Sequence, residues 1–207
     1  MNTSTAALGV FLAAGLAGCG DAPQPVAVDT PQRRSEFISI EQPLLSYALE
    51  RQDGSVVRRV SERASFRSGD RFRLVVEPQV PLHVYLFARG QDDAAYRVLQ
   101  SRDERRQPLP SGKATGVPAD GEGWLRFDTR AGTDTLVLVA STARVAALDA
   151  AAETIRRDAF EATLGTIERE LKPAEFHRTE DPEWIRLSAE NDGRPLAVVL
   201  RLPLVHK

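Results

Sequence analysis

The stretch FRSGDRFRLVVEPQVPLHVYLF, residues 66–87, carries the pattern that decides the fold. Residues 71–76 alternate between apolar and mostly polar side chains, a period of two that is typical of a strand with one buried face. Residues 82–87 are apolar on both faces, which predicts a central strand of a sheet. Pro78 and Pro81 bracket the turn between the two strands. The stretch therefore predicts adjacent strands at the heart of a β structure.

Shorter segments of the same kind lie on either side of this stretch. Asp53 and Gly54 form a tight-turn signal between two of them, because glycine accepts a positive φ. A polar segment rich in proline and glycine, residues 101–121, separates two others. Repeated short strands with such turns favour an antiparallel sandwich. We predict a mainly β fold, an immunoglobulin-like antiparallel β-sandwich, with further strands at 44–51, 56–60, 96–100, 124–127 and 135–140.

The period of the apolar residues changes after Ala140. Spacings of three and four then place apolar side chains on one helical face. Asp158 followed by Glu161 has the form of a capping box, and Pro173 supplies a stop signal. We therefore expect a helical segment over 142–172, either two helices or one kinked helix.

The C-terminal part of the chain predicts a β-hairpin over residues 184–204. Two strand-like runs, 184–190 and 196–202, flank the turn sequence Asn191-Asp192-Gly193. This pattern leaves open whether the hairpin completes the sandwich or forms a separate subdomain.

The N-terminus predicts the location of the protein. An uncharged, mostly apolar run of 12 residues, Ala6–Ala17, has the length of a signal-peptide core and is too short to span a bilayer. It ends in Leu16-Ala17-Gly18-Cys19, which resembles the lipobox of bacterial lipoproteins. The resemblance implies cleavage before Cys19 and lipidation of Cys19, the only cysteine of the chain. A buried N-terminal helix with an incidental cysteine is the alternative.

These assignments divide the chain into functional segments. Residues 1–18 are the expected signal peptide, 19–36 the lipidated cysteine with a proline-containing tether, and 37–207 a single globular domain. Gly20, rather than an aspartate, follows the cysteine, which by the sorting pattern of related lipoproteins implies the periplasmic face of the outer membrane. The segment preceding the apolar run departs from the usual pattern because it contains no Lys or Arg.

The central half of the chain, 44–141, resembles the domain-of-unknown-function family 4384. The resemblance rests on the Phe66 to Phe72 segment with its Gly69-Asp70 turn, on the strand ending in Tyr85-Leu86-Phe87, and on the closing GTDTLVLVAS at 132–141. Where the family has Leu-Phe-Pro, this chain has Val98-Leu99-Gln100. The resemblance implies an envelope or signalling module without known catalytic residues, so it assigns no functional residue here.

Composition and motifs exclude several classes of function. With 27 basic and 29 acidic residues, a strongly basic nucleic-acid binder is not expected. Ser111-Gly112-Lys113 lacks the remainder of a phosphate-binding loop. His177, near Glu175 and Glu180, could ligate a metal or support hydrolysis, but a solvated acidic loop is the preferred interpretation. We therefore predict no catalytic residue, no cofactor and no metal site.

Two surface features remain open. Arginines cluster between 51 and 73, either as a positive face for lipid phosphate or an acidic partner, or as a consequence of overall composition. Trp124 and Trp184 are expected to anchor the core rather than to form ligand platforms. The sequence predicts a non-enzymatic, lipid-anchored interaction module of the cell envelope with an envelope protein as partner. The alternative is a small-ligand or glycan-binding lipoprotein that uses the 101–121 loop beside Trp124.

Overall fold

The computed structural model describes residues 41–119, 123–172, 176–190 and 193–207, all of which lie in one compact unit. The predicted signal peptide, the lipobox of Leu16, Ala17 and Gly18, the lipidated Cys19 and the tether to residue 36 lie outside the described residues. Within the described residues, no helix has the length and apolar character needed to cross a bilayer.

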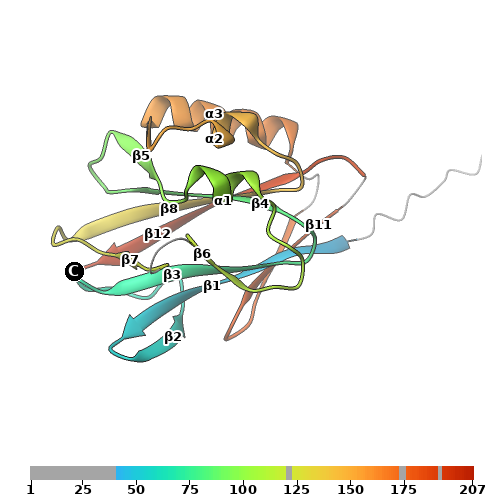
Figure 1. Cartoon of the computed structure of the whole chain (residues 1–207). Helices are drawn as coiled ribbons and strands as arrows, with labels where there is room; N and C mark the ends of the chain where they lie inside the picture. The colour runs from blue at the N-terminus through green and yellow to red at the C-terminus, as the bar shows by residue number, and fades with distance from the viewer. Residues whose placement is uncertain (1–40, 120–122, 173–175, 191–192) are drawn as a thin grey trace, which may run out of the picture. The chain divides into compact units, whose positions relative to one another are not determined.

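Strands dominate the structure and form two sheets (Figure 1). Sheet A has seven strands, in the order β10-β11-β1-β3-β6, with β2 paired to β1 and β7 paired to β3. Its strands are β1 (Glu41–Asp53), β2 (Val56–Val60), β3 (Arg71–Pro78), β6 (Thr115–Val117), β7 (Leu125–Arg126), β10 (Phe176–Glu180) and β11 (Ile185–Glu190).

Sheet B has five strands, in the order β12-β8-β4-β5-β9. Its strands are β4 (His83–Arg89), β5 (Ala95–Val98), β8 (Gly132–Ser141), β9 (Thr154–Arg156) and β12 (Ala197–His206). The helices are α1 (Arg102–Arg106), α2 (Ala146–Asp149) and α3 (Arg157–Glu170). Every strand pairing in both sheets is antiparallel.

The main hydrophobic core lies between the two sheets. Alternate residues of β1 and β3 enter it from sheet A, including Tyr47, Leu49, Leu74 and Val76, each at most 2% exposed. Sheet B contributes alternate residues of its central strands, among them Leu86 and the equivalent positions of β8 and β12. The mainly β fold of two packed antiparallel sheets is thereby confirmed. Its immunoglobulin-like character stays a prediction.

A second core covers the other face of sheet B. Tyr85 and Phe87 point away from the main core and pack with Phe160 and Leu164 of α3. The rings of Phe87 and Phe160 have centroids 4.5 Å apart, and all four residues are fully buried. The molecule is therefore layered, with α2 and α3 over sheet B and sheet B over sheet A (Figure 1).

The prediction of a helical segment over 142–172 is only partly right, because a strand interrupts it. α2 has four residues, and β9 then forms an edge strand on β5 before α3 begins. The capping box of Asp158 and Glu161 is wrong, since Asp158 instead binds Arg156 and the backbone of Ala159. Pairing with β5 outweighs the local helical pattern at β9, because the strand gains partners that the sequence pattern does not reveal.

The predicted hairpin over 184–204 is also wrong. β11 pairs with β1 and β10 in sheet A, whereas β12 pairs with β8 in sheet B. The turn sequence marks a crossing between sheets, and its residues 191–192 lie outside the described part. The hairpin of this region is β10–β11, so the expected acidic loop at His177 is a strand. A turn signal predicts a change of direction but not which strand becomes the partner.

The described part of the polar segment, residues 101–119, is more ordered than its composition suggests. Ser101 and Glu104 form a reciprocal capping box that starts α1. Arg105 is 4% exposed, and its guanidinium donates to the carbonyl oxygens of Leu148 at 2.5 Å and Ala151 at 3.0 Å. The segment is thus fastened to the α2 region rather than free to form a ligand-binding loop.

Candidate functional site

The outer face of sheet A, turned away from both cores, carries a row of aromatic and charged side chains. Alternation along β1 and β3 places Glu50 and Arg73 on this face, because their neighbours Leu49 and Leu74 point into the core. The pairing of Glu50 with Arg59 adds β2 to the row. Trp124 and Trp184 stand at the two ends of what we call the Trp–Arg row: Trp124, Arg73, Glu50, Arg59 and Trp184.

Glu50 is the centre of the Trp–Arg row. Its carboxylate accepts from Arg73 at 2.8 Å and 2.7 Å and lies 3.8 Å from Arg59 Nε. Glu50 is only 9% exposed, whereas the two arginine side chains are about a third exposed. One carboxylate therefore positions two guanidinium groups that remain open to solvent.

Each of these arginines covers a tryptophan ring. The guanidinium carbon of Arg59 lies 4.2 Å from the ring centroid of Trp184, and that of Arg73 lies 4.6 Å from the ring centroid of Trp124. Such cation–π contacts fix both groups on the surface. Both tryptophans are half-buried and belong to neither core, so the expectation that they anchor the core is wrong.

A notch opens in sheet A beside Trp184. β1 pairs with β11 as far as Tyr47 and with β2 from Leu49 onward. Among the described residues, Ala48 therefore has no cross-strand partner on that side. A hollow of about 370 Å³ lies at this change of neighbour, and its lining includes Arg59 and Trp184. A second hollow of about 530 Å³, lined by Ser46 and Glu77, also reaches Trp184. Small side chains at Ser46 and Ala48 leave this space open.

Ion pairs hold the rim of the notch. The buried Tyr47 hydroxyl donates to Glu62 at 2.5 Å, and Glu62 also binds Arg178 at 2.6 Å. Burial, followed by the Glu62 contact, raises the pKa of Tyr47 well above its ordinary value. Arg178 in turn reaches Glu180 at 2.9 Å. Arg178 thus pairs with both carboxylates, which is typical of a rigid wall rather than of acid–base chemistry.

Asp181 shapes the turn that presents Trp184. Its carboxylate accepts from the backbone N–H groups of Trp184 at 2.7 Å and Glu183 at 2.9 Å. These hydrogen bonds, with that to Trp184 the larger cause, lower the pKa of Asp181 below its ordinary value. The ionised carboxylate therefore favours the turn that carries the tryptophan.

We expect the setting of Trp184 to loosen in acid. Because folding lowers the pKa of Asp181, its carboxylate stabilises the folded turn above the ordinary aspartate pKa of about 3.9, and this stabilisation is lost as the pH falls through the folded value. In a Trp124→Phe variant, Trp184 fluorescence should change with a midpoint below about 3.9. The added Asp181→Asn change should abolish that transition, and an unchanged midpoint would contradict the assignment.

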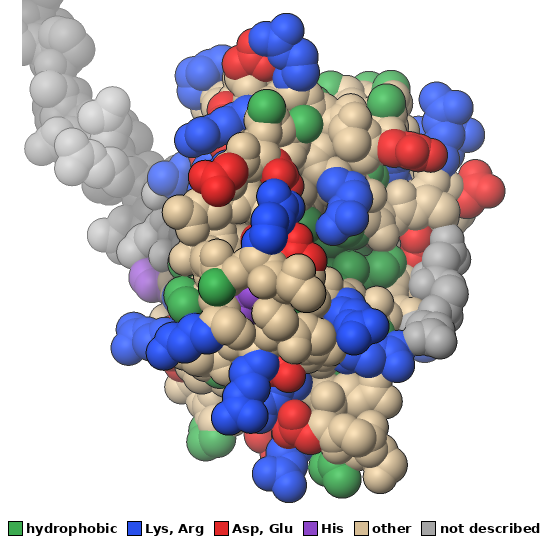
Figure 2. All heavy atoms as spheres, turned by 90° about the vertical axis from the view of Figure 1, so that its left-hand side faces the viewer, with side chains coloured by type: hydrophobic (Ala, Val, Ile, Leu, Met, Phe, Trp, Pro, Cys, Tyr) green, Lys and Arg blue, Asp and Glu red, His purple; other side chains and the backbone are tan. Residues whose placement is uncertain are grey.

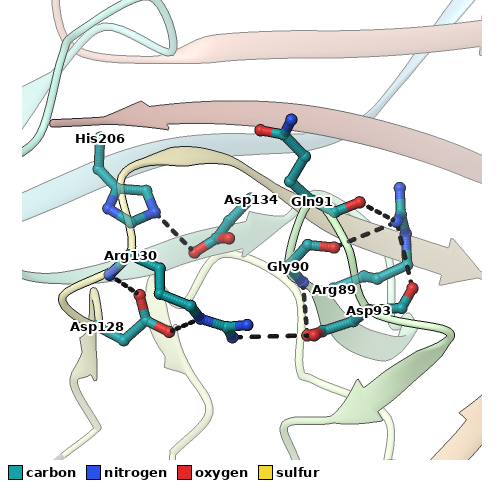
Figure 3. Close-up of polar contacts among 8 residues, drawn as sticks. All are labelled: Arg89, Gly90, Gln91, Asp93, Asp128, Arg130, Asp134 and His206. Atoms are coloured by element: carbon teal, nitrogen blue, oxygen red, sulfur yellow. Dashed lines mark hydrogen bonds and ion pairs between the residues drawn. The ribbon is translucent and has the colours of Figure 1, made fainter.

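A second polar cluster closes one end of the sandwich (Figure 3). Asp128 binds Arg130 at 3.2 Å, and Arg130 lies 3.9 Å from Asp93 in the β4–β5 turn. Nearby, His206 Nε2 lies 3.6 Å from Asp134. In Figure 2, which faces this end, basic and acidic side chains are interspersed rather than gathered by sign. The cluster joins loops from several strands.

Two of the three carboxyl groups of this cluster have pKa values shifted in opposite directions, because their surroundings differ. Burial raises the pKa of Asp134 above its ordinary value, although His206 opposes the shift. Hydrogen bonds from Arg130 lower the pKa of Asp128. His206 is 2% exposed and stacks on Phe127 with ring centroids 4.7 Å apart. A histidine so enclosed cannot reach a substrate, so we treat this cluster as a structural clamp.

The remaining sequence candidates do not converge on a site. His177 is exposed on β10, Glu180 is paired with Arg178, and Glu175 lies outside the described residues. Ser111 and Gly112 lie in a turn, where the Gly112 N–H donates to the Pro78 carbonyl. Over the described ranges, no group of His, Cys, Asp or Glu is arranged to hold a metal ion.

Sequence reasoning missed Glu50 as the organising residue. The Asp53–Gly54 turn fixes a register in which Glu50 faces Arg59, and that register could have been read from the hairpin signal. Comparison with known proteins returned no matching family model, no matching curated protein and no matching solved structure. The candidate site therefore rests on its own geometry: the Trp–Arg row on the outer face of sheet A and the notch beside Trp184.

Proposed function

We propose that the protein is a non-enzymatic, lipid-anchored interaction module of the bacterial envelope that docks a partner protein on the outer face of sheet A. The predicted lipobox at Leu16-Ala17-Gly18-Cys19 supports the anchor. The resemblance of residues 44–141 to the domain-of-unknown-function family 4384 stays a prediction, since no family model matches the chain. We place the module at the periplasmic face of the outer membrane, with no cofactor and no nucleic-acid partner.

The observation that carries this proposal is the asymmetry of the two sheets. The outer face of sheet B is packed under α3, whereas the Trp–Arg row holds half-buried tryptophans and partly exposed arginines on sheet A. Tryptophan and arginine are enriched among residues that dominate protein interfaces. Because Glu50 and the rings already fix both guanidinium groups, little side-chain entropy would be lost on docking.

In-cell crosslinking with mass spectrometry of co-purified proteins tests the proposal. A specific partner should be recovered with the native chain and lost in the Trp184→Ala variant. Glu170→Ala, an exposed change on α3, is the matched control and should retain the partner. Equal recovery from all forms would contradict docking on this face.

The lipid anchor carries a separate expectation. A Cys19→Ala variant should lose the acylated residue and move from the membrane fraction to the soluble envelope fraction, because several acyl chains are needed for stable anchoring. Fractionation followed by immunoblotting measures the shift. If the variant remains with the membranes to the same extent as the native chain, the anchor assignment is wrong.

A small-ligand or glycan-binding role is the second candidate, and the hollows beside Trp184 favour it. Their volumes, about 370 Å³ and 530 Å³, fall in the range of small-molecule sites. They lie at the notch rather than at the 101–121 segment where the sequence placed this function. A thermal-shift screen with envelope glycans would support this role if the shift disappeared in Trp184→Ala, and a screen without shifts would count against it.

A further inference from the structure

β2 is an edge strand, and one of its two sides is not paired with another described strand. Within the described residues it pairs with β1 and with no second strand. Along the same side of β1, the neighbouring β11 does have a further strand, β10. An added strand on β2 would therefore continue the line of β10, next to the notch. Unpaired backbone groups on such an edge are a ready template for another chain.

The side chains of β2 favour pairing with an added strand, because two of them are exposed and β-branched. Val56 and Val57 are 47% and 44% exposed, and they are two of the three large hydrophobic residues that the described part of the chain leaves exposed. β-branched residues favour strand pairing, and exposed ones gain most from a new neighbour. β12, by contrast, lies at an edge of sheet B but is interrupted by Pro203, which has no N–H to donate.

The positive charge of Arg58 favours an acidic residue on an added strand. Arg58 lies directly opposite Arg51 in the β1–β2 pairing, and like charges in such positions repel. Arg51 is compensated by Asp53 at 3.0 Å. Arg58 is exposed and has no ion pair or hydrogen bond within the described residues. An acidic residue on a neighbouring strand would supply the missing counterion.

We propose that β2 binds an extended segment of a partner protein as an added strand, with an acidic residue of that segment opposite Arg58. This inference rests on the proposed function and names the chemistry of the partner. Backbone hydrogen bonds would provide attachment, the valines would provide apolar contact, and Arg58 would select for an acid. A second copy of this chain fits less well, since antiparallel self-pairing of β2 would bring the arginines of both copies together.

The test uses the purified lipidated protein in detergent micelles. The probes are synthetic peptides of alternating valine and threonine that differ at one central position, which is Glu, Gln or Lys. Binding is measured by fluorescence anisotropy, and backbone pairing by protection of the β2 amides from hydrogen exchange. We expect the Glu peptide to bind about fivefold more tightly than the Lys peptide, as a cross-strand ion pair implies.

Charge reversal guards against a folding defect. Arg58→Glu should invert the preference, so that the Lys peptide binds more tightly, while Arg169→Glu, at an exposed site on α3, should leave the order unchanged. Three results would overturn the inference: no binding of the Glu peptide, an order unaffected by Arg58→Glu, or protection outside β2. A concentration-dependent dimer with protection of the β2 amides in the absence of peptide would identify a second copy as the occupant instead. A negative result in the peptide experiment does not affect the crosslink that depends on Trp184. The two proposals can therefore be rejected separately.

Discussion

Replacing Phe160 by alanine is expected to lower the free energy of unfolding by about 3–5 kcal/mol, the range for a large aromatic side chain removed from a core. Phe160 is fully buried, and its ring centroid lies 4.5 Å from that of Phe87 and 4.3 Å from that of Tyr96. It is one of three buried side chains of α3, with Leu164 and Ile167, that pack against sheet B. The variant should therefore loosen the helix as well as create a cavity.

Urea denaturation followed by circular dichroism measures this effect. Glu170→Ala, an exposed change on the same helix, should shift the free energy by no more than about 0.5 kcal/mol. Loss of α3 should also uncover the apolar outer face of sheet B and increase binding of a hydrophobic dye. If Phe160→Ala resembles Glu170→Ala, then α3 does not cover sheet B as described, and the asymmetry between the sheets fails.

Replacing Glu50 by glutamine is expected to cost about 2 kcal/mol, since removing one member of a largely buried, charge-assisted contact leaves its partners uncompensated. Arg73 would then lose its carboxylate partner, whereas Arg59 would keep only Glu183, which lies 3.0 Å away. The partial exposure of both arginines limits the loss, which keeps the expected cost below that of a deep ion pair. Both tryptophan rings should lose their fixed setting.

The matched control for this change is Glu170→Gln, an exposed change on α3. Chemical denaturation reports the stability, and near-ultraviolet circular dichroism reports the order of Trp124 and Trp184. We expect reduced stability and weaker tryptophan bands for Glu50→Gln, with neither change in the control. Indistinguishable variants would show that Glu50 does not organise the Trp–Arg row.

The strands that the sequence predicted well are those whose two faces differ. The alternation at 71–76 identified β3, and the double-sided apolar run at 82–87 identified β4 as central. β4 is apolar on both faces because one face meets the main core and the other meets α3. The pattern of apolar residues therefore predicted correctly which faces of β3 and β4 are buried.

The sequence was less informative where pairing depends on distant residues. β9 reads as part of a helix, and its strand character comes from Ala95–Arg97 on β5. β11 and β12 read as a hairpin, yet they belong to different sheets. The sequence predicts Trp184 to be a core residue. Its actual place on the surface follows from the Asp181 turn and from the contact with Arg59, which periodicity does not reveal.

The candidate site shows the same limit. Arginines and tryptophans were visible as residue types, but the sequence could not choose between a solvated arginine surface and an organised one. That choice depends on Glu50, whose carboxylate joins Arg73 on β3 to Arg59 on β2. Only the register of the three neighbouring strands brings these groups together.

Site-specific photo-crosslinking in cells tests directly whether a partner protein docks on the outer face of sheet A. A photoreactive phenylalanine analogue would replace Arg71 or Glu77 on the outer face of sheet A, and Ala162 or Glu170 on α3. One discrete protein adduct is expected from the sheet A positions and none from the helix. Adducts that form equally from α3, or only from α3, would contradict docking on the outer face of sheet A.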